Sequence, residues 1–235
     1  MQPLDLYATI EEHLDFKEEI EHLYNSIAHI VFAINPTSVI DIGCGQGDFC
    51  QILESNGLKT LGVDLSQKQI QIAKSKKIDA QCVDIKDCKE KFDCATAVFD
   101  VINYISKNNI KEFLTHTYNL LENNGYFIFD INSLYGFEEV AQGTLTIDTD
   151  DKFIAIDANF EDNCLATDIT LFTKETTLYK KDYGTIKQYY HENKELKKIL
   201  QAVGFKIENI INFNLHSDED FDKFIFVCKR VKNDF

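Results

Sequence analysis

The stretch "VIDIGCGQGDF", Val39 to Phe49, places three glycines on alternate positions directly after a run of buried-type residues. The preceding run "SVIDI" is rich in β-branched residues and predicts a short strand. The following "DFCQILESNG" predicts a helix, with Phe49, Ile52 and Leu53 on one face. Such a glycine loop removes side-chain bulk where backbone N–H groups at a helix N-terminus can meet an anionic ligand group. The loop therefore predicts a ligand site at the carboxyl end of a strand.

The alternation of strands and helices continues on both sides of the loop. Before it, apolar residues recur at helical spacing from Ile20 to Ile34, which predicts one N-terminal helix or two. After it come strand-like runs at residues 59–65, 79–85, 92–100 and 126–132, and helical patterns at 66–76 and 110–121. Alternation of this kind is typical of βαβ units and indicates an α/β fold, a parallel sheet covered by helices on both faces.

The texture changes after Ser133. From about Thr144 to His191, β-branched and aromatic residues dominate and polar turns separate them, which predicts antiparallel strands. A helix over residues 193–204 and two closing strands follow. We therefore expect one α/β domain built from residues 1–140, with N-terminal helices in 1–36, and from 190–235. Residues 141–189 would form a β-rich insertion.

Two acidic residues end the strands that follow the loop. Asp64 can accept hydrogen bonds from both hydroxyls of a ribose, although an acid that merely precedes the Ser66 helix cap is the plainer interpretation. Asp84 can accept from an adenine amino group while Ile85 packs on the ring. The glycine spacing is G-x-G-x-G, and Asp48 stands where a dinucleotide fingerprint has its third glycine, so a pyrophosphate ligand fits poorly.

With these features the chain resembles the class I S-adenosylmethionine-dependent methyltransferases. The stretches "VIDIGCGQGDF", "LGVDLS", "CVDI", "FDCATAVFDVINYI" and "NNGYFIFDIN" are similar to five successive motifs of that family. The resemblance covers residues 39–133 closely and the last forty residues by pattern. It implies a Rossmann-like sheet of seven strands whose last strand is antiparallel, with the β-rich insertion as a lid over a small-molecule substrate.

The resemblance also implies which residues contact S-adenosylmethionine. Around the methionine half it places Asp41 and the loop residues Gly43, Cys44, Gly45 and Gly47. It places Asp64, with Leu65 after it, at the ribose, Asp84 and Ile85 at the adenine, and Phe99 and Asp100 nearest the sulfonium.

Methyl transfer is an in-line displacement in which orientation supplies much of the rate enhancement. A base is needed only when the acceptor is a protonated amine or a hydroxyl. Asp100 is the first candidate for a base or substrate anchor, and a cap or a cofactor contact is an equally good interpretation of it. His191 is the second candidate, because histidine titrates near neutrality, although packing is its commoner role. The residues expected to line the substrate cleft are Asn103, Tyr104, Asn132, Tyr135 and Tyr190.

Composition narrows the partners. Twenty-four basic and thirty-nine acidic residues give a net charge of −15, which disfavours nucleic acid. The sequence has no apolar run of membrane-spanning length and no leader-like start, and its seven scattered cysteines suggest reduced thiols in the cytoplasm. No spacing of cysteine and histidine resembles a metal site. We expect a monomer or homodimer that methylates an O or N atom of a small molecule. The alternatives are a catalytically silent protein that binds S-adenosylmethionine as a sensor or partner subunit, and a nicotinamide oxidoreductase.

Overall fold

A sheet of seven strands in the order β10-β11-β5-β4-β1-β2-β3 forms the centre of the computed structural model, which describes residues 2–216 and 219–231. Strands β1 to β5 pair in parallel, and β11 is antiparallel to both of its neighbours, as expected. The bounds are β1 (Ser38–Ile42), β2 (Lys59–Asp64), β3 (Ala80–Cys82), β4 (Phe92–Ala97), β5 (Leu121–Asn132), β10 (Phe205–Phe213) and β11 (Lys223–Arg230).

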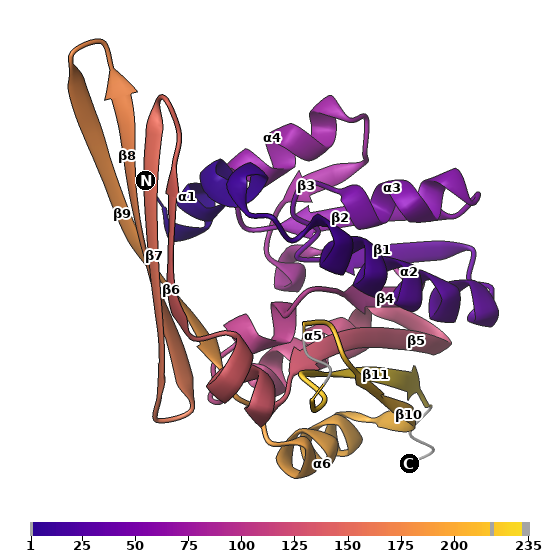
Figure 1. Cartoon of the computed structure of the whole chain (residues 1–235). Helices are drawn as coiled ribbons and strands as arrows, with labels where there is room; N and C mark the ends of the chain where they lie inside the picture. Colours follow the sequence, from indigo (N-terminus) through magenta and orange to yellow (C-terminus); the bar gives the residue numbers. More distant parts are fainter. Residues whose placement is uncertain (1, 217–218, 232–235) are drawn as a thin grey trace.

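Helices cover both faces of this sheet (Figure 1). On one face lie α2 (Lys17–Ile34), α3 (Asp48–Ser55) and α4 (Gln67–Ser75), and on the other α5 (Ile110–Leu120) and α6 (Asn193–Val203). Leu23, Ile27 and Val31 of α2 recur every four residues and are fully buried against the sheet. Full burial of each such side chain contributes about 1.5–3 kcal/mol. The apolar residues at helical spacing in the sequence thus form the face of α2 that packs on the sheet.

A second sheet of four antiparallel strands stands apart from the core, at the left of Figure 1. It consists of β6 (Gly143–Asp148), β7 (Lys152–Glu161), β8 (Cys164–Glu175) and β9 (Leu178–Tyr189), each paired with the next. The β7–β8 turn contains Asp162 and Asn163, both with positive φ, as a two-residue hairpin turn requires. The sheet lies within the β-rich stretch expected between α/β elements.

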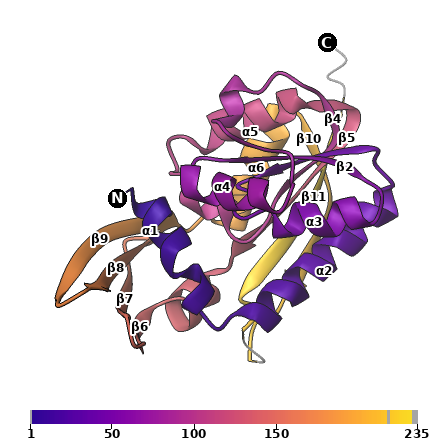
Figure 2. The same ribbon diagram turned by 90° about the horizontal axis from the view of Figure 1, so that it is seen from above.

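The first helix, α1 (Pro3–Ile10), lies between the second sheet and the core (Figure 2). Its Leu6 and Ile10 are fully buried in a cluster with apolar residues of β7, β8 and β9. On the core side, the Asp5 carboxylate accepts a 2.6 Å hydrogen bond from the Ser66 hydroxyl at the start of α4. The sequence pattern groups all N-terminal helices with the α/β domain, whereas α1 packs on both parts.

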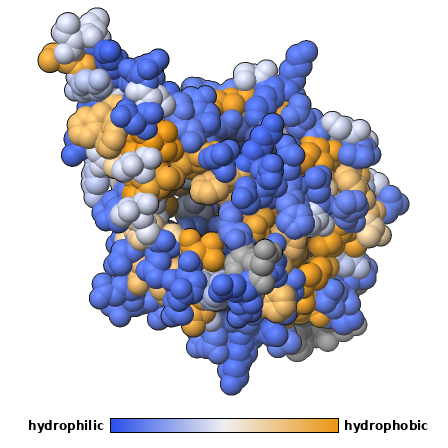
Figure 3. Space-filling view, viewed as in Figure 1, coloured by the Kyte–Doolittle hydropathy of each residue, from blue (hydrophilic) through white to orange (hydrophobic). Residues whose placement is uncertain are grey.

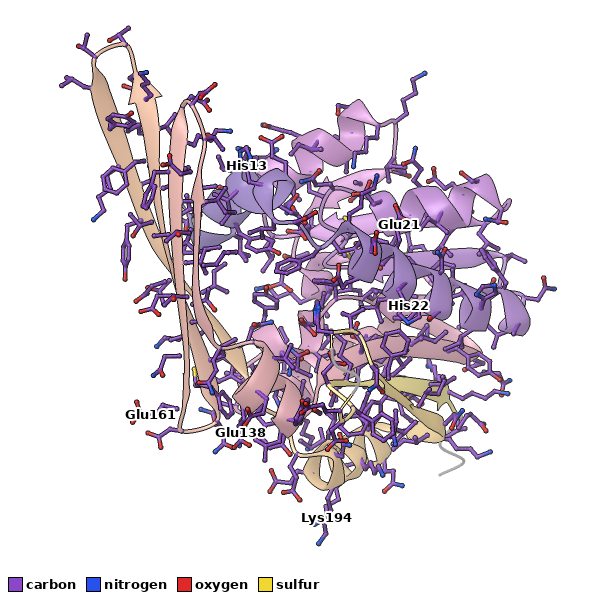
Figure 4. All side chains as sticks on the ribbon, in the orientation of Figure 1. His13, Glu21, His22, Glu138, Glu161 and Lys194 are labelled. Atoms are coloured by element: carbon purple, nitrogen blue, oxygen red, sulfur yellow. The ribbon has the colours of Figure 1, made fainter. Side chains whose placement is uncertain are left out.

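The one-turn helix η1 (Glu11–His13) continues α1. Lys152 Nζ of β7 lies 2.8 Å from His13 Nε2, and Figure 4 shows His13 at the end of η1. Among the described residues, no helix is long and apolar enough to cross a membrane. Residues 1, 217–218 and 232–235 of the expected α/β domain lie outside the described part of the chain.

Candidate active site

A cavity of about 700 Å³ opens at the carboxyl ends of β1, β2 and β4. Its volume falls within the range of roughly 300–1,000 Å³ that small-molecule sites occupy. The core supplies the floor, and α1, η1 and the start of α2 supply the opposite wall. The space-filling view shows the molecule hollowed between the second sheet and the core (Figure 3).

The glycine loop forms one end of the cavity. Gly43, Gly45 and Gly47 have φ angles of +71°, +52° and +79°, the left-handed region that glycine adopts without strain. At Gly43 a Cβ atom would lie 2.5 Å from Val101 Cγ2, so a side chain is excluded there by space as well. Gly43, Cys44 and Gly45 line the cavity, whereas Gly47 does not and instead caps α3. The alternate glycines are therefore explained by one tightly turned backbone.

Asp64 lies beside this loop at the end of β2. Its carboxylate accepts hydrogen bonds from the backbone N–H groups of Gly45 at 3.0 Å and Ser66 at 2.7 Å, and it lines the cavity. Burial raises the pKa of this carboxyl, and the two N–H donors oppose the rise. Among the described residues no cation forms an ion pair with it. The arrangement leaves a fixed carboxylate with lone pairs for hydroxyl donors.

Three further expected residues follow around the rim. Ile85 is buried and Leu65 is two-thirds exposed, and both line the cavity. Asp84 also lines it, with its carboxylate 3.1 Å from Lys86 Nζ. The ion pair and the N–H of Lys86 lower the pKa of Asp84 despite the opposing cost of partial burial. Phe99 and Tyr104 complete the group of expected residues that reach this cavity.

Three other expected residues, Asp41, Asp100 and His191, do not line the cavity. Asp41 is buried under the loop, where it accepts a 2.7 Å hydrogen bond from the Thr96 hydroxyl, and burial raises its pKa to about 7. Asp100 turns away from the cavity to an ion pair with Lys223. His191 is buried, with Nε2 2.9 Å from the Ile105 carbonyl oxygen, and burial lowers its pKa. Neither candidate base is thus among the cavity-lining residues.

The remaining residues expected to contact the substrate do not line this cavity: Asn103 and Asn132 are buried, and Tyr135 and Tyr190 lie elsewhere. Asn103 is fully buried, and it donates to the Tyr189 carbonyl at 3.0 Å and accepts from the Asn132 N–H at 3.0 Å. It thereby ties β9 to the end of β5 rather than facing a ligand. Tyr135 and Tyr190 line a separate open groove beside α6, near Lys194, which points away from the core in Figure 4.

The N-terminal segment contributes to the cavity, which the sequence patterns did not predict. Tyr7 of α1 and Glu11 of η1 line the cavity. Glu11 Oε2 accepts 2.9 Å hydrogen bonds from the side-chain amides of Gln46 and Gln69, which closes η1 over the glycine loop. In the sequence Gln69 stands out only for its place in a helix cap, and no local pattern pairs Glu11 with a residue 58 positions away.

Gln69 also presents an unused acceptor. Its Nε2 donates to Glu11, so the remaining amide atom is Oε1, which is buried without a partner in the described structure. A buried carbonyl oxygen without a donor is costly unless a ligand or water supplies one. Gln69 lines the cavity, but its Oε1 atom is buried below the cavity surface.

The lining is acidic and aromatic. Burial raises the pKa of the Tyr7 and Tyr104 phenols, so both remain hydrogen-bond donors near neutral pH. Lys86 and His116 also line the cavity, beside five carboxylate residues: Glu11, Asp48, Asp64, Asp84 and Glu112. Such a surface favours ligands that carry positive charge and hydroxyl groups.

Comparison with known proteins gives a family and a set of similar structures. Residues 15–210 match a family model described as a methyltransferase domain. A putative methyltransferase of Geobacillus sp. strain WCH70 is 25% identical over 208 residues, which cover 82% of this chain and 84% of the relative.

Two solved structures share the whole fold. An S-adenosylmethionine-dependent methyltransferase from Clostridium acetobutylicum superposes with a TM-score of 0.78 at 24% identity, covering 97% of this chain and 98% of its own. The sugar N-methyltransferase KedS8 from a Streptoalloteichus species has a TM-score of 0.75 at 16% identity, covering 97% and 93%. At these identities the likeness concerns the fold.

Proposed function

The chain belongs to the methyltransferase domain family, and on this premise we propose that it uses S-adenosylmethionine to methylate an amine nitrogen of a small molecule. In this proposal the backbone of the Gly43–Gly47 loop borders the methionine half of the cofactor. Asp64 accepts from the ribose hydroxyls, and Ile85 packs on the adenine. When bound, the cofactor supplies an electrophilic methyl group on a sulfonium.

The acidic lining of the cavity is the observation that carries the choice of acceptor. Carboxylates attract an ammonium group, and the cavity extends from the glycine loop past Tyr7 and Tyr104, which leaves room for an acceptor beside the cofactor. KedS8, whose fold this chain shares, is a sugar N-methyltransferase, and we extend that choice of acceptor atom to this protein as part of the proposal.

The residues of the wall act mainly by orientation. Holding an amine in line with the reacting methyl group, with water excluded, can supply about 7–11 kcal/mol of the barrier reduction. Protonated Tyr7 and Tyr104 can hold hydroxyl or amine groups of the acceptor. An ammonium acceptor must lose a proton before the displacement, and in this proposal a carboxylate of the cavity lining accepts it. This assignment requires neither Asp100 nor His191 as a base.

Methyl transfer to matched acceptors tests the proposal. The purified protein would be incubated with S-adenosylmethionine carrying a labelled methyl group and with pairs of small polyols that differ only in one amine for one hydroxyl. We expect mass spectrometry to find the label on the nitrogen of the amine members. Labelled oxygen alone would overturn the choice of acceptor atom. Binding of S-adenosylhomocysteine without product from any acceptor would favour the catalytically silent alternative.

The family match leaves the nicotinamide alternative without support. All seven cysteines are free thiols, which suits the cytoplasmic location that we propose.

A further inference from the structure

Lys223, the first residue of β11, is a buried cation with a full set of acceptors. Its side chain is 2% exposed, and Nζ lies 3.0 Å from Asp130 Oδ2 and 2.9 Å from Asn132 Oδ1. A third hydrogen bond goes to Asp100 Oδ1. Burial opposes the charge, but the two carboxylates outweigh it and raise the pKa of Lys223. An ammonium has three donors, and here each has an acceptor.

Asp130 connects this cation to the backbone at the end of β4. It is fully buried, and its oxygens accept from the N–H groups of Phe99 at 2.6 Å and Asp100 at 3.2 Å. Phe99 and Asp100 have φ angles of +68° and +69°. Two successive residues other than glycine in the left-handed region persist only where their surroundings hold them there. The buried carboxylate provides that restraint, and Lys223 provides its counter-charge.

The same cation faces an aromatic ring of the cavity. Lys223 Nζ lies 5.4 Å from the centre of the Phe99 ring, within the distance of a cation–π contact. Phe99 lines the cavity, whereas Lys223, Asp130 and Asp100 do not. The cluster therefore contacts the Phe99 ring from behind and its backbone from β5, and it has no direct access to a ligand.

We propose that Lys223 is a positioning residue that, with Asp130, holds Phe99 and Asp100 in the left-handed conformation and so fixes the Phe99 ring on the ligand-facing wall. A fixed position of the Phe99 ring in the cavity lining determines how closely the cavity fits its ligand. Loss of the cation leaves the carboxylates of Asp130 and Asp100 close together without their counter-charge, which disturbs the restraint on Phe99. This inference requires that the cavity binds the cofactor of the proposed function, and it is independent of the acceptor.

A double-mutant cycle on ligand affinity tests this role. Calorimetry would give the Kd of S-adenosylhomocysteine for the wild type, Lys223→Met, Phe99→Leu and the double variant. We expect each single change to raise the Kd about tenfold, because misplacement of a contacting group by an ångström has effects of this size or more. Because Lys223 acts through Phe99, the double variant should also be weakened about tenfold, rather than about a hundredfold as independent effects would give.

Controls separate positioning from loss of stability. Leu200→Ala removes a fully buried side chain of α6 outside the cavity, and it should lower the thermal midpoint while the Kd stays within about twofold. If Lys223→Met does not fold, Asp100→Asn replaces it in the cycle, since it removes the charge of one partner of the cation at a partly exposed position. An unchanged Kd in the Lys223 and Asp100 variants, or multiplicative effects in the double variant, would overturn the inference. Absence of wild-type binding would instead refute the proposed cofactor, and this role with it.

Discussion

At the scale of single residues, two carboxylates of the chain accept hydrogen bonds from pairs of backbone N–H groups, one at each end of the parallel strands. Asp64 holds two such groups at the carboxyl edge of the sheet and lines the cavity. Asp93 accepts from the N–H groups of Thr37 and Ser38 at the opposite edge. The two residues thus share a chemical arrangement and differ in whether a ligand in the cavity can reach them.

Asp64→Asn should therefore weaken cofactor binding. The N–H groups of Gly45 and Ser66 bind different oxygens of Asp64, so the single amide oxygen of asparagine keeps only one of them, and the charge and an acceptor for the ligand are lost. We expect calorimetry with S-adenosylhomocysteine to show a Kd at least about tenfold higher, since a hydrogen bond to a charged group is worth roughly 1.5–3 kcal/mol. Asp93→Asn is the matched control and should bind as the wild type does. Equal losses in the two variants would contradict a ligand-binding role for Asp64.

Asp41 gives a pH-dependent prediction. Burial raises its pKa to about 7 from an ordinary value of 3.8, so the folded protein binds a proton that the unfolded chain releases between these values. This group's contribution to stability therefore falls as the pH rises from about 4 to 7. An asparagine side chain at this position cannot ionise, and its oxygen can still accept from Thr96. The free energy of unfolding of Asp41→Asn minus that of the wild type should therefore increase between pH 5 and pH 8. The increase is about 1.4 kcal/mol for each pH unit up to the pKa of about 7.

Chemical denaturation at pH 5 and pH 8 measures this difference. Asp93 serves again as the control, because hydrogen bonds, first that from the Thr37 hydroxyl, lower its pKa below the ordinary value. Asp93→Asn should lose stability to the same extent at both pH values, which lie above its titration. A gap between Asp41→Asn and the wild type that stays constant from pH 5 to pH 8 would show that Asp41 is ionised throughout.

The site could be predicted from the sequence only where one short segment determines the geometry. The glycine loop, Asp64 and Ile85 each follow a recognisable strand, and each lines the cavity. Asp100 follows a strand too, but its left-handed backbone and the ion pair with Lys223, 123 residues later, turn it away. His191 is enclosed by the loop after β4 in the same way. Contacts between segments that are distant in the sequence determine these orientations, and the hydrophobic periodicity of the sequence does not reveal such contacts.

At the scale of elements, α1 and η1 line the cavity, although the sequence patterns did not place them there. Hydrophobic spacing predicts the strands, the later helices and the β-rich stretch, because each follows a local pattern. The place of α1 depends on the second sheet and on α4, through Leu6 and Asp5. The amides of Gln46 and Gln69 then join η1 to the glycine loop and to α4. One short segment thus completes a cavity that the core alone leaves open.

Glu11→Gln should loosen this closure. A neutral amide accepts more weakly than a carboxylate, so the two hydrogen bonds to Gln46 and Gln69 lose their charge assistance. We expect S-adenosylhomocysteine to dissociate several-fold faster in stopped-flow measurements, as is usual when contacts at a binding site are weakened. Glu12→Gln, the same change one residue later on an exposed side chain, should leave the rate unchanged. Equal rates for all three proteins would exclude a role of Glu11 in closure.

At the scale of the whole molecule, the second sheet is joined to the rest of the chain through buried apolar clusters with α1 and with Phe137, which follows β5. Leu6 and Ile10 of α1 pack against it, and the Asn103 amide bonds to the end of β9. The rest of the sheet extends beyond the core in Figure 1. Its stability therefore depends on α1 more than the stability of the seven-stranded sheet does.

Leu6→Ala tests this dependence. Removal of a fully buried leucine typically costs about 2–5 kcal/mol, and here the loss falls on the cluster that α1 shares with β7, β8 and β9. Hydrogen exchange read by mass spectrometry should show faster exchange in β8 and β9, with β1, β4 and β5 protected as in the wild type. Leu53→Ala, which opens the α2–α3 side of the core instead, should have the opposite pattern. Uniform acceleration along the chain in both variants would show that the two sheets unfold together.

The packing of α1 also has a consequence for synthesis on the ribosome. Ile169 and Ile186, which bury this helix, are synthesised more than 150 residues after it. Until then Leu6 and Ile10 lack their apolar contacts on β8 and β9, so α1 cannot yet pack in its final place beside the cavity. A ribosome-bound intermediate can therefore form the glycine loop early, but the enclosed site is completed only after β9 has been synthesised.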